Sequence, residues 1–134
     1  MAMLEALEGI AKTYKAKLKS AGFNNTDQLL AKGATPAGRK SIAADTGISE
    51  KLILRWVNMA DLFRIKGVGE EYSDLLEAAG VDTVPELAQR NAENLFQKVK
   101  EVNAKKKLVR RVPSLTEITD WISQSKKLPR KVNY

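Results

Sequence analysis

The sequence contains neither cysteine nor histidine. Disulfide bonds, thiol nucleophiles and imidazole bases are therefore excluded, together with zinc sites of the usual Cys/His type. The sequence also lacks a Gly-Lys-Ser/Thr phosphate loop and any paired-carboxylate signature of an acid–base catalyst. We therefore expect a non-enzymatic protein with no cofactor and no bound metal. A cysteine-free chain suits a reducing compartment, and we expect a cytoplasmic protein.

Long hydrophobic runs are missing as well, and no segment alternates well enough to form a strand. No apolar stretch approaches the length that spans a bilayer, so we expect no membrane partner. The start of the chain, Met1–Glu8, carries acidic residues and no basic region, unlike a secretory signal. Aromatic residues make up only 6% of the 134 residues, and Leu, Ala, Lys and Glu dominate. This composition predicts a soluble, all-helical protein.

Acidic residues are scarce in the last third of the chain. The net charge is +7, but residues 1–97 hold 12 basic and 13 acidic side chains, whereas residues 98–134 hold 11 and 3. Such an asymmetry indicates attraction to a polyanion. The competing interpretation is a charged surface that only keeps the protein soluble.

The strongest organisational signal is an internal repeat. The segments Gly9–Phe23 and Gly67–Val81 align at an offset of 58 residues. The identical pairs are Gly9/Gly67, Tyr14/Tyr72, Leu18/Leu76, Ala21/Ala79 and Gly22/Gly80. A match of this length indicates a duplicated unit of roughly sixty residues.

A second match supports the duplication and locates an insertion. Ser49–Val57 aligns with Ser114–Ile122 at an offset of 65, and this pairs Trp56 with Trp121. The larger offset means that the second copy carries about seven extra residues, near Lys105–Pro113. We predict one unit over residues 1–61, a second over residues 62–125, and a loosely ordered basic tail over residues 126–134.

Helix start and stop signals occur at matching places in the two copies. Gly22 and Gly80 are each followed by an apolar residue, as in helix C-termini that end with a left-handed glycine. The sequence Thr83–Glu86 fits a capping box, and Asn25–Gln28 fits the same device with other residues. Four or five helices per copy are expected. The predicted helix starts are Asn25, Thr35, Ser49, Thr83, Asn91 and Ser114.

The segment Ile65–Ala88 carries a family resemblance. An apolar residue, then Gly67-Val68-Gly69, then a helix resembles the helix-hairpin-helix family. The continuation through Gly80 and Thr83 is similar to the variant found in DNA-repair proteins and in the C-terminal domain of the RNA polymerase alpha subunit. The duplicated form resembles an uncharacterised prokaryotic family of tandem helix-hairpin-helix proteins. The resemblance implies two tandem helix-hairpin-helix units packed as a pseudo-duplicated compact protein.

The chemistry of such a hairpin can be stated independently of the family. A turn that ends at a helix N-terminus exposes unpaired backbone N–H groups, and the helix dipole favours an anion there. Glycine permits positive φ and lets a phosphate come close to the backbone. Contacts of this kind bind phosphate rather than bases. We therefore expect sequence-independent binding of a nucleic-acid backbone, of double-stranded DNA more than of RNA.

The two hairpins differ in their glycines and charges. In the second, Glu70 and Glu71 follow the glycines and compete with a phosphate for the helix N-terminus. In the first, Ala11 replaces the second glycine and would be strained at positive φ, but the following helix is rich in lysine, with three on one face. The nucleic-acid-binding residues predicted from both copies and from the basic cluster are Gly9, Ile10, Lys12, Lys15, Lys19, Lys66, Gly67, Val68, Gly69, Lys105, Lys106, Lys107, Arg110 and Arg111.

Other interpretations of these segments remain open. A Gly-x-Gly pair also forms tight turns that bind nothing. The basic helix of the first copy and the acidic helix of the second could attract each other, within or between molecules, which would make the protein a protein-interaction or homo-oligomer module. Trp56 and Trp121 follow apolar residues at helical spacing and are predicted to be core residues. The segment Gly47–Trp56 has a helix-turn-helix character, but it is too apolar to contact base edges.

Overall fold

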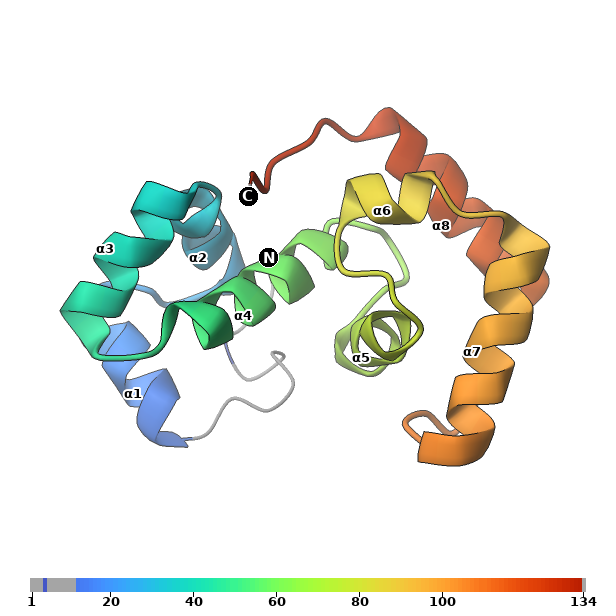
Figure 1. The fold of residues 1–134 in the computed structure, drawn as a ribbon, viewed down its shortest axis with the longest axis horizontal. Coiled ribbons are helices and arrows are strands. Elements are labelled where there is room, and N and C mark those ends of the chain that lie inside the picture. Colours follow the sequence, from blue (N-terminus) through green and yellow to red (C-terminus); the bar gives the residue numbers. More distant parts are fainter. Residues whose placement is uncertain (1–3, 5–11, 134) are drawn as a thin grey trace. The chain divides into compact units, whose positions relative to one another are not determined.

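The computed structural model describes Leu4 and residues 12–133, and this part of the chain forms eight α-helices and no β-strand (Figure 1). The predicted all-helical fold class is confirmed. In chain order the helices are α1 (Lys12–Ser20), α2 (Thr26–Gly33), α3 (Pro36–Thr46), α4 (Glu50–Leu62), α5 (Glu70–Ala78), α6 (Val84–Ala88), α7 (Ala92–Lys106) and α8 (Leu115–Lys127). None of these helices combines the length and hydrophobicity that crossing a membrane requires.

Five helices begin at predicted capping residues whose side chains satisfy free N–H groups of the first turn. In each case the side-chain oxygen accepts a hydrogen bond from the backbone N–H three residues later. The five caps are Asn25, Thr35, Ser49, Asn91 and Ser114. Ser114 belongs to a complete capping box with Glu117, whose carboxylate accepts the Ser114 N–H at 3.1 Å. Local chemistry therefore sets most of the helix starts.

The capping box predicted for α6 does not form. Thr83 occupies the N-cap position, but its side chain makes no cap hydrogen bond. The Glu86 carboxylate, which would complete the box, accepts a hydrogen bond from Arg90 at 2.8 Å instead. A second local partner, four residues further along the chain, thus takes the carboxylate that the capping box would use.

Two helices end at the predicted left-handed glycines. Gly22 has φ of 96° and Gly80 has φ of 94°. The residue after each glycine donates its N–H back into the helix. Phe23 donates to the Leu18 carbonyl at 2.9 Å, and Val81 donates to the Leu76 carbonyl at 2.8 Å. This bond pattern is a Schellman motif, so the predicted ends of α1 and α5 are confirmed.

The chain divides into two compact units, one of Met1–Asp61 with Lys131–Tyr134 and one of Leu62–Arg130. The division after Asp61 coincides with the boundary between the sequence repeats. Within the described residues each unit has four helices in the same order. The duplication itself stays a prediction from the sequence.

The core of unit 1 includes Trp56, which lies on α4 and is fully buried. Its indole contacts Tyr14 of α1, with ring centroids 5.5 Å apart. Ile53 and Val57 on α4 are also fully buried, so this helix turns its apolar residues inward. Such a helix cannot offer these side chains to base edges, which agrees with the apolar character of the segment Gly47–Trp56.

The C-terminal residues correct the expectation of a loosely ordered tail. Helix α8 continues through Lys127, and Val132 is only 1% exposed. The Asn133 N–H donates to the Ala34 carbonyl at 2.8 Å, and its own carbonyl accepts from the buried Arg39 guanidinium at 2.7 Å. Arg39 also donates to the Gly33 carbonyl at 2.8 Å. These last residues are therefore an integral part of unit 1.

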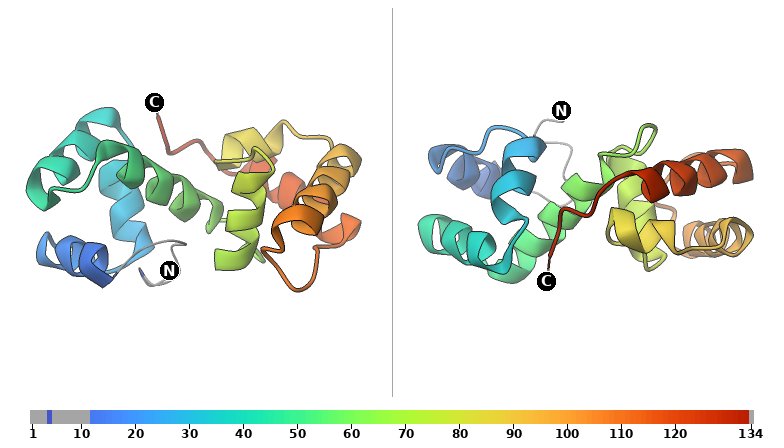
Figure 2. Two further views of the ribbon diagram at one scale, coloured as in Figure 1. Left: turned by 60° about the horizontal axis from the view of Figure 1, so that its bottom comes forward. Right: turned by 90° about the horizontal axis from the view of Figure 1, so that it is seen from above.

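In unit 2, α8 packs along α6 and α7, and α7 packs against α5 (Figures 1 and 2). Trp121 on α8 is 2% exposed and contacts Tyr72 of α5, with ring centroids 5.3 Å apart. Both tryptophans are thus core residues, as predicted, and each is paired with the tyrosine of its own unit. In unit 2 this aromatic pair supports the surface described next.

Candidate nucleic-acid interface

The glycine turn of unit 2, residues 65–69, is a type II turn. The Val68 N–H donates to the Ile65 carbonyl at 3.1 Å, and Gly67 has φ of +99°. A type II turn requires positive φ at its third residue, which favours glycine. A Cβ on Gly67 would also lie 3.0 Å from the Trp121 indole nitrogen. Glycine is therefore favoured at position 67 for two reasons, the positive φ and the close approach of the Trp121 indole.

The second glycine has a different role. Gly69 is the N-cap of α5, with φ of −111° and ψ of −160°, and a Cβ there would meet nothing within 4 Å. Alanine can adopt this extended backbone. The conformation of Gly69 therefore gives no reason to expect backbone strain at the equivalent alanine of the first copy. The predicted residues Gly9 and Ile10, and Ala11 beside them, lie outside the described residues.

The turn leaves several backbone donors exposed. Gly67, Gly69 and Glu70 are exposed, and their N–H groups have no acceptor in the described part of the chain. Val68 differs from this group because its side chain is buried and its N–H is already bonded to the Ile65 carbonyl, so this N–H is not available to a ligand. Exposed N–H groups at the start of α5 can bind an anion, although the Glu70 and Glu71 carboxylates oppose one.

The backbone at Lys66 is held from α8. The Lys66 N–H donates to the Gln124 side-chain oxygen at 2.8 Å, and the Gln124 amide group donates to the Lys66 carbonyl at 3.0 Å. The same amide group also donates to Asp120 at 2.9 Å. The Lys66 side chain is left exposed.

The basic loop, Lys105–Arg111, is fixed at three points. Lys107 closes α7 in the left-handed conformation, with φ of 51°, and donates its N–H to the Asn103 carbonyl at 2.8 Å. The Asn103 side chain accepts the Val109 N–H at 3.0 Å and donates to the Val109 carbonyl at 3.1 Å. The Tyr72 hydroxyl donates to the Arg111 carbonyl at 3.1 Å. The loop is thus an ordered platform.

Three of the five cations predicted on this loop are available to a ligand. Lys106, Lys107 and Arg110 are exposed and form no ion pair with any described residue. Lys105 lies 4.0 Å from the Glu101 carboxylate, which is a weak, exposed pair. The loop therefore presents a cluster of uncompensated positive charge.

Arg111, the fifth predicted cation of the loop, forms an ion pair within unit 2. Its guanidinium donates to both carboxylate oxygens of Glu117, at 2.7 and 3.0 Å, so its charge is already paired. The Arg111 hydrogen bond, together with that from the Ser114 N–H, lowers the pKa of Glu117 from 4.5 to about 2. The same pairing raises the pKa of Arg111. Glu117 thus serves the α8 cap and neutralises one loop cation.

The glycine turn and the basic loop contact the same aromatic pair. Gly67 lies against the Trp121 indole, and Tyr72, whose ring packs on Trp121, holds the Arg111 carbonyl. The structure therefore brings the predicted residues of unit 2 onto one support, although about forty residues of sequence separate them. Exposed amides and free cations on one such support can bind an anionic backbone.

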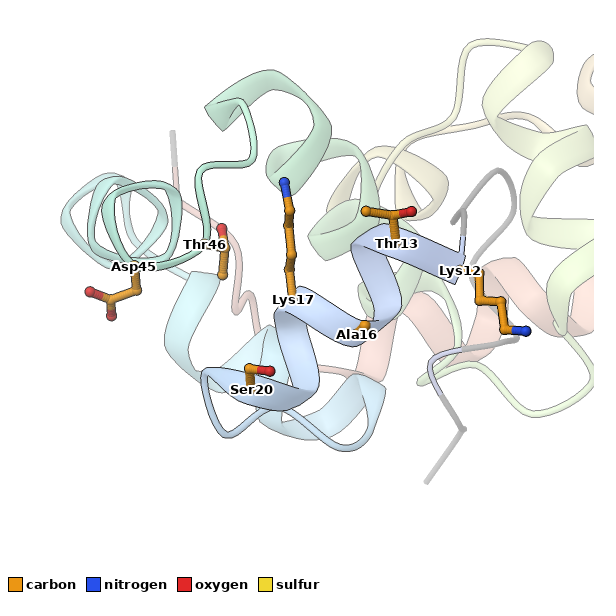
Figure 3. A pocket seen from close by; sticks show the side chains of 7 residues that line it. All are labelled: Lys12, Thr13, Ala16, Lys17, Ser20, Asp45 and Thr46. Carbon is orange, nitrogen blue, oxygen red and sulfur yellow. The ribbon is translucent and has the colours of Figure 1, made fainter.

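In unit 1 the predicted lysine face of α1 is only partly retained. Lys12 and Lys19 are exposed, whereas Lys15 is half-buried and has an interaction partner. A groove of about 540 Å³ lies between α1 and the end of α3, lined by Lys12, Thr13, Ala16, Lys17, Ser20, Asp45 and Thr46 (Figure 3). Lys12 and Lys17 point in different directions from α1, so they do not converge on one anion (Figure 3).

The sequence analysis missed the residues that hold the surface in place. Gln124, Asn103 and the Tyr72 hydroxyl bind backbone groups 58, 6 and 39 residues away. The repeat identified Tyr72 as the partner of Tyr14, but no pattern in the sequence indicates the backbone contacts of Gln124 or Asn103. Among the described residues no cluster of acidic side chains is suited to hold a metal ion.

Comparison with known families identifies a family for this chain. A family model described as "Domain of unknown function (DUF4332)" covers residues 8–128, which is most of the chain. No solved structure matches the chain. The comparison therefore establishes a family without assigning it an activity.

Proposed function

The chain belongs to the DUF4332 family, and we propose that it is a non-enzymatic protein that binds the sugar–phosphate backbone of nucleic acid independently of sequence. Double-stranded DNA in the cytoplasm is the expected target. The finer assignment, a tandem helix-hairpin-helix protein, is part of the same proposal. It is supported by the glycine turn before α5 and by the matching helix order, glycine ends and tyrosine–tryptophan pairs of the two units.

The observation that carries the proposal is the basic loop. Lys106, Lys107 and Arg110 are exposed and unpaired among the described residues, on backbone that Asn103 and Tyr72 hold in place. Each phosphate that a lysine or arginine neutralises releases a bound counterion, and this release drives binding without reference to base sequence. A loop that is ordered in advance also loses little conformational freedom when it binds.

The glycine turn adds directional donors to this charge. Gly67 of the turn lies against the same aromatic pair that holds the loop, so we expect one nucleic-acid backbone to contact both segments. The carboxylates of Glu70 and Glu71 weaken the turn as an anion site on its own. We therefore assign most of the affinity to the loop and a smaller, orienting part to the turn.

Titration of a labelled mixed-sequence duplex with the full chain tests the proposal. At low salt we expect binding whose affinity falls as salt rises, with a slope of about −3 in a plot of log K against log salt concentration, for three phosphate contacts. A duplex of unrelated sequence should bind about equally well. Absence of binding at low salt, together with a dimer in light scattering, would instead support the protein-interaction alternative.

Replacing Glu117 with glutamine tests the pairing of Arg111. The neutral amide frees the guanidinium, so we expect duplex affinity at low salt to rise about three-fold, for one additional weak phosphate contact. The weaker capping box should cost about 1 kcal/mol of the free energy of unfolding. The matched control is Glu93→Gln, which makes the same charge change at the start of α7, whereas the basic loop lies at the end of that helix. Equal gains in affinity for both variants would show that only net charge matters.

The pH dependence of stability follows from the same group. The pKa of Glu117 is lowered to about 2, so its stabilising contribution is complete above pH 4.5 and is lost as pH falls toward 2. The difference in unfolding free energy between wild type and Glu117→Gln should therefore shrink over this range. Urea denaturation at several pH values measures it.

A further inference from the structure

We propose that Gln124 is a positioning residue for the glycine turn, holding one peptide plane so that the Gly67 N–H faces solvent, where a phosphate can accept it. This inference rests on the proposed function and adds to it a residue outside the turn. Gln124 lies on α8, 58 residues along the chain from its bonding partner Lys66.

Both ends of the Gln124 side-chain amide form hydrogen bonds. Its oxygen accepts the Lys66 N–H at 2.8 Å, and its NH2 group donates to the Lys66 carbonyl at 3.0 Å and to the Asp120 carboxylate at 2.9 Å. Because Asp120 binds the second hydrogen, the amide is held in one orientation. Gln124 therefore pairs with Lys66 as a neighbouring strand would, through both backbone groups of one residue.

The carbonyl bond sets the direction of the next N–H. The Lys66 carbonyl and the Gly67 N–H belong to the same peptide plane, and in a trans peptide they point in opposite directions. No peptide bond among the described residues is cis. With the carbonyl turned toward α8 and held by Gln124, the Gly67 N–H is directed away from α8. Gly67 is exposed, and this N–H has no acceptor among the described residues.

The positive φ of Gly67 makes this restraint useful. In a type II turn the central peptide can rotate toward the type I arrangement, which reverses the direction of its carbonyl and its N–H. Glycine does not itself prevent that rotation, because it accepts both signs of φ. The two bonds from Gln124 oppose the rotation. These two bonds thus favour the type II turn, in which the Gly67 N–H faces solvent.

The sequence repeat supplies a natural comparison. The residue at the position equivalent to Gln124 in the first copy is Met59, which is buried and can form neither bond. The first copy also has alanine in place of the second glycine of the pair. The amide clamp and the intact glycine pair thus occur together in the second copy. A Gln124→Met variant of the full chain gives α8 the first copy's residue with little change in volume.

The test compares wild type, Gln124→Met and a control, Gln97→Ala, in which an exposed glutamine of α7 is removed. The isotopically labelled full chain is titrated with a mixed-sequence duplex at low salt, and backbone amide signals are followed by NMR. In wild type we expect shifts in both the glycine turn and the basic loop. In Gln124→Met the shifts at Gly67 and Gly69 should largely disappear while those of the loop persist. Affinity should fall about five-fold to ten-fold, as expected for lost hydrogen bonds.

Each outcome separates this inference from the proposed function. Loop and turn shifts in Gln124→Met that equal those of wild type, with affinity equal to Gln97→Ala, overturn the positioning role while duplex binding stands. Loss of loop shifts as well overturns it too, because the effect is then general and not confined to the turn. A wild-type chain that binds no duplex overturns the proposed function, and the inference falls with it. Equal unfolding midpoints for the three proteins exclude misfolding as the cause, and Gln124→Ala provides a second variant if Met perturbs the fold.

Discussion

Replacing Lys106, Lys107 and Arg110 together with glutamate is expected to reduce duplex affinity at low salt by at least about 100-fold, because three phosphate contacts are lost and three like charges are introduced. The slope of log K against log salt concentration should fall toward zero. The substitution leaves the Asn103–Val109 pairing and the Tyr72–Arg111 bond untouched. The loop should therefore keep its shape, and the loss reports charge rather than structure.

The control for this result must change net charge equally at another place. Lys32, Lys40 and Lys51 are exposed lysines of unit 1 that belong to no predicted site. Their triple replacement with glutamate should weaken binding only through the general field, by far less than the loop variant. Equal losses in the two triple variants would contradict the assignment of the loop. They would show that the chain binds polyanions through its overall charge.

Replacing Gly67 with alanine is expected to lower the free energy of unfolding by about 2 kcal/mol, since a non-glycine residue at positive φ costs about 1–2 kcal/mol before any steric contact is counted. The added Cβ would also lie 3.0 Å from the Trp121 indole nitrogen. Because Trp121 is 2% exposed and packed against Tyr72, the indole has little room to move. Urea denaturation of the full chain measures the loss.

The neighbouring glycine gives a matched comparison for this prediction. Gly69 has φ of −111° and open space where a Cβ would lie, so Gly69→Ala should cost at most about 1 kcal/mol, the loss expected for alanine at an N-cap. The two variants differ by two positions and remove the same amount of flexibility. If both destabilise equally, the conformational requirement assigned to Gly67 is wrong.

How much of the fold the sequence could predict depends on the range of the interaction involved. Caps such as Thr35 and Asn91 act on an N–H three residues away, so composition and spacing suffice to place them. The left-handed ends at Gly22 and Gly80 are equally local. Thr83 shows that local signals can also compete, since Arg90, four residues after Glu86, binds the carboxylate that the capping box needed.

The candidate site was predictable only in its composition. Runs of lysine and arginine identify a basic loop, but not that Glu117 pairs with Arg111. Likewise a Gly-x-Gly pair does not disclose which glycine carries positive φ, because that is decided by the turn type and by the position of Trp121. Bonds between distant residues, such as Gln124 with Lys66, follow from tertiary packing and leave almost no trace in a single sequence.

The attachment of Asn133 to Ala34 and Arg39 has a consequence for biosynthesis. Translation proceeds from the N-terminus, so residues 131–133 leave the ribosome after all of unit 2 has been made. The half of the protein that is started first is consequently finished last, and a fragment ending at Asp61 would lack a piece of its own interior. Dissecting the chain into separately expressed halves would therefore require grafting the final residues back onto the first half.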